Sequence, residues 1–414
     1  MLKRISSTAA HEDLIDGPYA WFRLSVCILI SAIGSVGMWA VIVVLPAVQA
    51  EFGVDRAGAS VPYTSTMIGF ALGNVLAGRA VDRFGLMLPL MGAGAALGIG
   101  FAGASVSGAI WQFAILQGLF IGIGSSVCFG PLIADVSHWF RRRRGIAVAA
   151  AASGNYIAGA IWPNLIQLGL QYDGWRSTYL VIGLVSVVTM LPLALLLRRQ
   201  VAFDTPAQAG AEKQGAQTQP IDLSPGGLQL LLAVAGIGCC VAMSMPQVHI
   251  VAYCADLGYG VARGAEMLSL MLMGGIFSRL VSGFLADRIG GVRTLLLGSI
   301  LQCLALFFYL PFDGLASLYM VSLLFGLSQG GIVPSYAIIV REYLPAREAG
   351  RRVGIVIMAT IVGMAIGGWM SGWIYDLTGS YQAAFLNGIA WNVLNISIML
   401  MILWRTGRTK FVPI

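Results

Sequence analysis

Long apolar stretches recur along the whole chain, and they constrain its fold more than any other feature. We identify twelve, each about 20 residues long, which is the length that an α-helix needs to cross a bilayer. Backbone groups in lipid must be hydrogen-bonded internally, and these stretches are too long for barrel strands, so each is predicted to be a helix. They cover residues 22–48, 60–80, 86–107, 110–135, 145–170, 176–198, 227–254, 264–285, 293–311, 314–341, 350–375 and 381–405.

The composition supports an integral membrane protein. Hydrophobic residues make up 58% of the chain and charged residues only 10%, whereas soluble domains carry roughly 25% charged residues. The six cysteines show neither a disulfide framework nor metal-ligand spacing, and no cofactor is expected. The N-terminal segment lacks the apolar core of a signal peptide, so the first span is expected to act as the insertion signal.

The distribution of basic residues predicts the orientation in the membrane. If the N-terminus is cytoplasmic, all but four of the 25 lysine and arginine residues fall in cytoplasmic segments. Three of the four, Arg56, Arg176 and Arg263, lie in outer loops, and the fourth, Arg279, lies within a span. The positive-inside rule therefore places both termini in the cytoplasm. This topology explains the net charge of +7 without a nucleic-acid partner, and it is compatible with a bacterial inner membrane.

One long polar stretch, residues 199–226, divides the chain into two halves. It is dominated by proline, glycine, glutamine and alanine, which is typical of a flexible linker, here a cytoplasmic one. The predicted organisation is a cytoplasmic tail at 1–21, a six-helix bundle at 22–198, the linker at 199–226, a second six-helix bundle at 227–405, and a C-terminal tail at 406–414.

The two halves repeat in sequence. GRAVDRFG at 78–85 follows the second span, and GFLADRIG at 283–290 follows the eighth. The basic runs RRRRG at 141–145 and AGRRVG at 349–354 repeat in the same way. Parallel repeats of this kind predict two pseudo-symmetric bundles that rock about a central cavity.

The repeated motif also predicts a cytoplasmic gate. Its glycines permit a tight turn, and its aspartates are positioned to pair with the basic runs. The alternative is a charge cluster that only sets the topology. The predicted gating residues are Asp82, Arg83, Asp287, Arg288, Arg141, Arg144, Arg351, Arg352 and Glu342.

Arg279 is the first candidate for binding a solute. It lies in the span 264–285 with no acid among its helical neighbours three and four residues away. A cation at membrane depth costs several kcal/mol unless it faces a watery cavity or a partner. Its guanidinium stays charged and offers a planar fork that matches a carboxylate. The alternative is that Arg279 pairs with Asp135 or another acid and only ties helices together.

Two further residues are candidates for proton coupling. His249 titrates near neutral pH and follows Pro246, which is expected to break or kink the seventh span. It could carry a proton or donate to a bound anion, or it could be a partnered histidine near the outer surface. Asp135 could also carry the coupling proton, or it could pair with His138 or the 141–144 run as part of the gate.

Polar side chains scattered among apolar ones suggest walls of a cavity for a small amphipathic solute. Most such groups are expected instead to form hydrogen bonds that pack helices together. The candidates for substrate contact are Trp39, Tyr63, Gln117, Asn155, Tyr156, Gln329 and Tyr336.

The chain resembles the major facilitator superfamily over essentially its whole length. The features that carry this resemblance are the twelve spans, the linker and the doubled motifs GRAVDRFG and GFLADRIG. The segments WFRRRRGIAVAAAASGNYIAGAIWP, GWRSTYLVIG and MPQVHIVAYCADLG resemble the monocarboxylate transporter family and its bacterial relatives, including the oxalate/formate antiporter branch. The resemblance implies an all-α membrane fold of two six-helix bundles. It also implies a carboxylate-binding role for Arg279, in the eighth helix, and a functional role for His249, in the seventh.

The resemblance departs from the oxalate transporters at one place. Those relatives carry a lysine in the eleventh helix, whereas the span 350–375 has no lysine or arginine beyond its basic entrance. One cation suits a monoanion better than a compact dianion. A short monocarboxylate such as lactate or pyruvate is therefore favoured over oxalate. The predicted function is proton-coupled uptake of this monoanion, by a protein that works as a monomer.

Other functions fit the sequence less well. Anion exchange or export on the same fold differs only in coupling. A membrane sensor that binds solute without moving it has no appended domain to support it. An enzyme is not indicated, because no HExxH motif, Ser/His pair or paired intramembrane aspartates are present.

Overall fold

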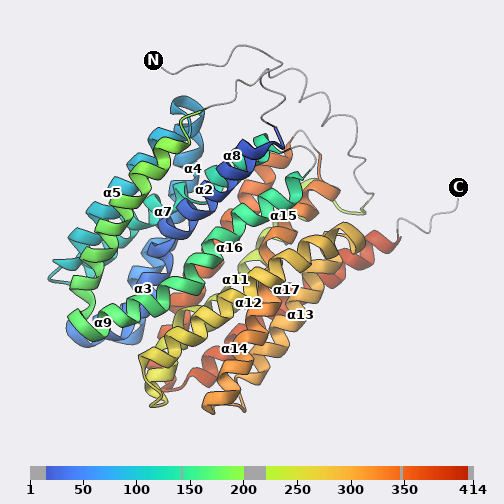
Figure 1. Ribbon diagram of the computed structural model, residues 1–414. Coiled ribbons are helices and arrows are strands. Elements are labelled where there is room, and N and C mark those ends of the chain that lie inside the picture. Colours follow the sequence, from blue (N-terminus) through green and yellow to red (C-terminus); the bar gives the residue numbers. More distant parts are fainter. Residues whose placement is uncertain (1–14, 141–142, 200–220, 346–347, 409–414) are drawn as a thin grey trace, which may run out of the picture. The chain divides into compact units, whose positions relative to one another are not determined.

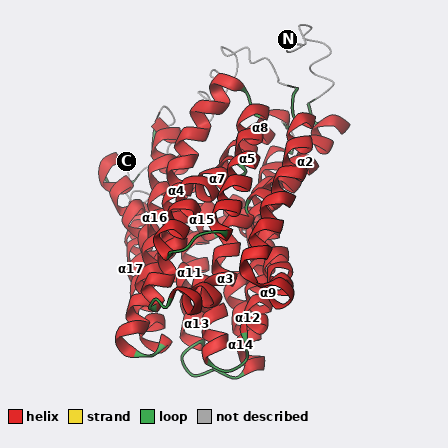
Figure 2. Ribbon diagram, turned by 90° about the vertical axis from the view of Figure 1, so that its left-hand side faces the viewer, coloured by secondary structure: helices red, strands yellow, loops and turns green. Residues whose placement is uncertain are grey.

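The described part of the chain is helical. The computed structural model describes residues 15–140, 143–199, 221–345 and 348–408 (Figure 1). These ranges contain helices joined by short loops and no strand (Figure 2). A helix satisfies its own backbone groups, which is the requirement that lipid places on an apolar segment.

The helices follow the predicted spans closely. Those before the linker are α2 (Pro18–Gly34), α3 (Val36–Phe52), α4 (Arg56–Phe84), α5 (Met87–Ser105), α6 (Ile110–Leu116), the π-helix η1 (Gln117–Gly122), α7 (Ile123–Val127), α8 (Gly130–Trp139) and α9 (Arg144–Leu196). Those after it are α11 (Pro225–Asp256), α12 (Val261–Ile289), α13 (Gly291–Phe308), α14 (Leu315–Gln329), α15 (Ile332–Tyr343), α16 (Ala349–Thr378) and α17 (Tyr381–Arg408).

Twelve membrane crossings can be traced in the described residues. Ten segments are long and apolar enough to cross a membrane, and the longest, Gly145–Leu196, has 52 residues. That segment contains Gly174 with a non-helical φ of 73°, so it is two crossings joined at a sharp bend. The remaining crossing is α4, whose 29 residues suffice in length but carry charges at both ends. The predicted all-α fold is therefore confirmed.

The chain separates into two compact units. By residue number, unit 1 covers Met1–Phe203 and Val251–Met273, and unit 2 covers Asp204–Ile250 and Gly274–Ile414. The end of α11 and the start of α12 thus pack within unit 1. There, Arg56 donates to both carboxylate oxygens of Asp256 at 3.0 Å. The six-helix division at the linker stays a prediction.

The doubled motif ends in a tight turn at both of its copies. Gly85 follows α4 with a φ of 74°, and Gly290 follows α12 with a φ of 83°. A residue with a Cβ atom rarely adopts this backbone conformation, which explains glycine there. The first glycines of the two copies, Gly78 and Gly283, have open space around them and carry no such requirement. The predicted turns are confirmed at the last glycine.

The fourth and tenth spans are both interrupted in their interior. The fourth contains the π-helical turn η1 and a break between α7 and α8, and the tenth breaks between α14 and α15 at Gly330 and Gly331. Helix ends leave backbone carbonyls without an intrahelical donor, so a break inside a membrane crossing creates acceptors at depth. Such carbonyls become binding positions for donors from neighbouring helices.

Pro246 does not break the seventh span, contrary to one of the two outcomes predicted for it. The helix α11 runs through it without interruption. Every residue from Gly238 to Ala252 is buried, so packing on all sides holds the segment helical despite the missing N–H. Tertiary contacts here override the local preference of proline.

Candidate functional site

Arg279 is held against the break in the tenth span. Its Nε donates to the carbonyl oxygen of Gly330 at 3.2 Å, and the residue is half-buried. In a continuous helix this carbonyl would accept from residue 334, which is Pro334 and has no N–H. The local sequence therefore leaves the Gly330 carbonyl for the arginine.

Small residues allow α12 to approach this break at backbone contact. A Cβ atom on Gly330 would lie 2.8 Å from the backbone nitrogen of Arg279 and closer still to the carbonyl oxygen of Gly275. A Cβ on Gly274 would lie 3.2 Å from the backbone of α14. The glycines at these positions allow close helix packing, and this packing determines where the Arg279 side chain projects from α12.

His249 is fully buried and bonded at both ring nitrogens. Its Nε2 lies 2.8 Å from the carbonyl oxygen of Gly368, and its Nδ1 lies 3.1 Å from the hydroxyl of Tyr381. A carbonyl oxygen only accepts, so Nε2 carries a hydrogen. In the neutral ring, Nδ1 then accepts from the Tyr381 hydroxyl. A proton added at Nδ1 would reverse this one bond and leave the bond to Gly368 in place.

The other candidates in unit 2 belong to hydrogen-bonded pairs or networks. Gln329 accepts from Nε2 of Gln247 at 2.7 Å. The hydroxyl of Tyr336 donates to Oδ1 of Asn395 at 2.9 Å, and Asn395 donates to Oγ of Ser299 at 2.7 Å. The Tyr336 network joins α15, α17 and α13.

Two candidates of unit 1, Trp39 and Asn155, lie together. The indole Nε1 of Trp39 donates to the backbone oxygen and to Oδ1 of Asn155, both at 3.1 Å. Gln117, the first residue of η1, donates to the hydroxyl of Tyr179 at 2.8 Å and is buried. The remaining candidates of unit 1, Tyr63 and Tyr156, are both buried.

Asp135 forms an ion pair with Arg23, a partner that the sequence analysis did not propose. Nε of Arg23 lies 2.7 Å from Oδ2 of Asp135, and its Nη2 lies 2.9 Å from Oδ1. Its Nη1 donates to the carbonyl oxygens of Leu197 and Arg199, after the end of α9, at 3.4 and 3.0 Å. Arg23 is 1% exposed. The only sequence feature that points to it is an arginine inside the first apolar helix, between Phe22 and Leu24.

The predicted gating residues are placed at helix ends. Asp82, Arg83, Asp287 and Arg288 are exposed. Within the described ranges, neither aspartate takes part in an ion pair.

The remaining gating candidates have other partners or lie outside the described residues. Arg352 pairs with Glu348 at 2.6 Å, and Glu342 accepts from the backbone nitrogen of Gly291 at the start of α13, at 3.0 and 3.2 Å. Arg351 is exposed. Arg141 and the side chain of Arg144 lie outside the described residues. The latch stays a prediction.

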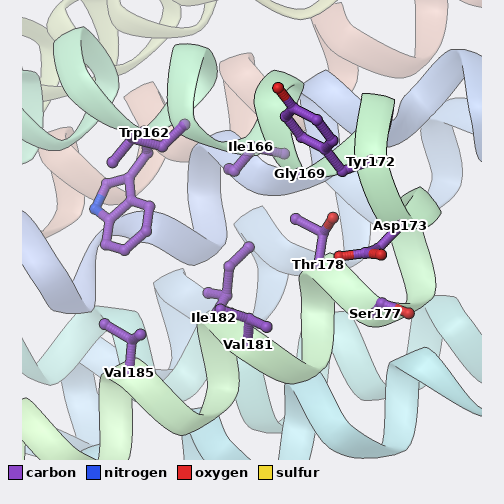
Figure 3. Close-up of a pocket in the computed structure, with 11 residues that line it drawn as sticks. Trp162, Ile166, Gly169, Tyr172, Asp173, Ser177, Thr178, Val181, Ile182 and Val185 are labelled. Carbon is purple, nitrogen blue, oxygen red and sulfur yellow. The ribbon is translucent and has the colours of Figure 1, made fainter.

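A separate cavity of about 530 Å³ opens between the two arms of α9, the helical segments before and after the bend at Gly174 (Figure 3). Trp162 and Tyr172 line it from the first arm, and Thr178 and Ile182 from the second. None of the predicted site residues lines it. Its lining is mostly apolar and includes exposed side chains such as Leu165 and Val181.

The described residues have the architecture of an all-helical, multi-pass membrane protein with interrupted helices. The family model described as Major Facilitator Superfamily matches residues 27–322 and 230–411. The chain therefore belongs to the Major Facilitator Superfamily. This membership indicates a transporter and not an enzyme.

Several proteins with assigned names are similar to the chain. Monocarboxylate transporter 13 of Bos taurus is 27% identical over 330 residues, covering 79% of this chain and 75% of the relative. Monocarboxylate transporter 4 of Mus musculus is 25% identical over 402 residues, covering 94% and 83%.

A solved structure supports the fold alone. It is a bacterial homolog to human lysosomal transporter Spinster, in an inward-facing and occupied conformation. It has a TM-score of 0.69 and 14% identity, covering 96% of this chain and 99% of that one.

The glycine contact behind Arg279 yields a prediction. In Gly330→Ala, the new Cβ meets backbone atoms of Gly275 and Arg279, so α12 must shift. Displacement of a binding group by about 1 Å can cost on the order of 100-fold in rate, and we expect transport to fall at least about tenfold. The matched control is Gly283→Ala on α12, the helix of Arg279, where nothing lies within 4 Å of the new Cβ. Equal transport rates for the two purified variants would contradict this role of Gly330.

Proposed function

We propose that this protein takes up a small organic monoanion, a monocarboxylate such as lactate or pyruvate, together with a proton and by alternating access. The observation that carries the proposal is Arg279, held in a membrane crossing by the Gly330 carbonyl at a helix break. The similarity to proteins named monocarboxylate transporters supports the same solute class.

Arg279 is proposed to bind the carboxylate group. Its guanidinium keeps its charge in an apolar environment and offers parallel N–H donors to two oxygens. The Nε bond to Gly330 fixes the plane of the group, which reduces the side-chain entropy lost when a solute binds. Further contacts are proposed for Trp39, Tyr63, Gln117, Asn155, Tyr156, Gln329 and Tyr336.

His249 is proposed to carry the coupling proton. An anion that moves inward against about 100 mV, negative inside, costs roughly 2.3 kcal/mol per charge, and one co-transported proton removes that cost. The Nδ1 atom of His249 faces a hydroxyl that either donates or accepts, so both protonation states keep a hydrogen bond. Asp135 is the weaker candidate, because its carboxylate is paired with Arg23.

The topology, the membrane and the oligomeric state of the transporter are part of the same proposal. Both termini lie in the cytoplasm, the membrane is a bacterial inner membrane, and the protein works as a monomer. The motif and the basic runs occur at corresponding places in the two halves of the sequence. The gating role of Asp82, Asp287 and their neighbours is proposed on that basis.

Uptake into proteoliposomes tests the proposal. Vesicles without internal substrate, given an inward proton gradient, are expected to accumulate labelled lactate or pyruvate, more strongly as the external pH is lowered. In His249→Gln the gradient should no longer drive accumulation. The matched control is His138→Gln, a histidine exposed near the end of α8.

Three outcomes would contradict parts of the proposal. Silence in empty vesicles followed by rapid exchange in loaded ones would make the protein an anion antiporter. Binding without any flux would make it a sensor. Full gradient-driven uptake by His249→Gln would exclude this histidine as the proton carrier.

A further inference from the structure

Two buried glutamines in unit 2 form a pair that uses only part of its hydrogen-bonding capacity. Nε2 of Gln247, on α11, donates to Oε1 of Gln329, the last residue of α14, at 2.7 Å. Gln247 is 2% exposed and Gln329 is 0% exposed. Within the part of the chain that the structure describes, Gln247 Oε1 and Gln329 Nε2 have no hydrogen-bond partner. Buried polar atoms in folded proteins are nearly always satisfied by protein, water or ligand.

The composition of this pair does not depend on how the two amides are oriented. The oxygen and nitrogen of a glutamine amide are assigned from the surrounding hydrogen bonds. If both amides were reversed, Gln329 would donate to Gln247, and one donor and one acceptor would again remain. The pair therefore presents one N–H donor and one carbonyl acceptor in either orientation.

The pair adjoins the proposed carboxylate site through the backbone. Gln329 immediately precedes Gly330, whose carbonyl oxygen accepts from Arg279. Consecutive Cα atoms are about 3.8 Å apart, so Gln329 and the residue whose carbonyl oxygen accepts from Arg279 are neighbours at the helix break. In the proposal below, the substituent next to the solute's carboxylate lies in this region.

We propose that the Gln247–Gln329 pair selects monocarboxylates with a hydroxyl group on the carbon next to the carboxylate. A hydroxyl both donates and accepts, so it satisfies the remaining acceptor and the remaining donor together. A 2-oxo group only accepts and leaves the glutamine acceptor without a partner. An unsubstituted carbon satisfies neither atom. This inference rests on the proposed function, because it places the carboxylate at Arg279.

The magnitude follows from the cost of a buried polar atom left unpaired. Sites built to bond a substrate hydroxyl reject analogues that lack it more strongly than apolar pockets reject a missing methylene. We expect kcat/KM for lactate to exceed that for propionate at least about tenfold, with pyruvate between them. All three are three-carbon monoanions, so size and charge stay constant across the comparison.

The experiment measures proton-driven uptake of lactate, pyruvate and propionate in proteoliposomes for the wild type and for matched variants. The variants are Gln247→Met, Gln329→Met and the double substitution, which keep the volume and remove the amides. The control is Gln302→Met, a 0% exposed glutamine of unit 2 that also has a buried Oε1 without a partner and donates to Cys239. We expect the lactate-to-propionate ratio to fall toward one in the double variant and to stay unchanged in the control.

The ratio separates recognition from a structural role. Loss of stability or of uptake for all three acids, with an unchanged ratio, would overturn the inference and leave monocarboxylate transport standing. Equal kcat/KM for the three acids in the wild type would also overturn the inference and leave monocarboxylate transport standing. Failure of the wild type to transport any of them would overturn the proposed function, and the inference with it.

Discussion

Arg279→Ala is expected to reduce carboxylate uptake at least about 100-fold while the purified protein remains folded. Hydrogen bonds to charged groups contribute about 1.5–3 kcal/mol each, and every 1.4 kcal/mol is a factor of ten in affinity. Loss of the two hydrogen bonds between the guanidinium and the carboxylate therefore accounts for a reduction of this size. Arg279→Lys should recover only part of the activity, because an ammonium group keeps the charge but lacks the planar fork. Uptake kinetics and size-exclusion profiles of the same preparations provide the measurement.

The same helix offers the control for this substitution. Arg263 lies at the start of α12 and pairs with Glu266 at 2.9 Å, with both side chains exposed. Arg263→Ala removes an arginine from α12 without touching the helix break, and we expect near-normal uptake. If Arg279→Ala transported as well as Arg263→Ala, or if Arg279→Lys kept the full affinity, the carboxylate role of Arg279 would be wrong.

Arg23→Met is expected to lower the free energy of unfolding by about 3–5 kcal/mol, the range found when one partner of a buried ion pair is removed. The substitution leaves the Asp135 carboxylate, which is 17% exposed, without its cation. It also removes the donor to the carbonyl oxygens of Leu197 and Arg199. Reversible unfolding of the purified protein in detergent measures the change.

A double substitution distinguishes an unpaired charge from lost packing. Arg23→Met combined with Asp135→Leu removes both charges, and we expect it to recover most of the lost stability. The exposed pair provides the comparison, since Arg263→Met should cost no more than about 1 kcal/mol. Similar losses for Arg23→Met and Arg263→Met would show that the buried pair has no special importance.

The positions of the helices could be predicted because hydropathy is a local property. The predicted span 264–285 lies within α12, and 293–311 overlaps α13. The observed helices mostly run a few residues beyond the apolar stretch, because helical hydrogen bonding continues into the polar region at the membrane surface. The turns at Gly85 and Gly290 were predictable for a similar reason: the doubled motif places a glycine where the chain reverses.

Side-chain partners were predicted less well, because they are chosen by packing. Nothing local connects Arg23 with Asp135 or His249 with Tyr381, which come from different helices. Gln247 was missed as a candidate because a single glutamine in an apolar span resembles many helix-packing residues. Pro246 shows the limit of a local rule in the other direction, since the break that was one of its two predicted outcomes does not occur in the continuous helix α11.

The sequence by itself determined the membrane class, the crossings and the two repeated turns, since lipid requires every apolar segment of sufficient length to satisfy its own backbone. It also singled out Arg279 by its depth. Only the tertiary structure decided what that arginine contacts, because the Gly330 carbonyl becomes an acceptor only when α12 packs against the break between α14 and α15. The cost of burying a polar group and the identity of its hydrogen-bond partners depend on atoms brought together from distant parts of the chain. Hydropathy describes only neighbouring residues and does not identify these partners.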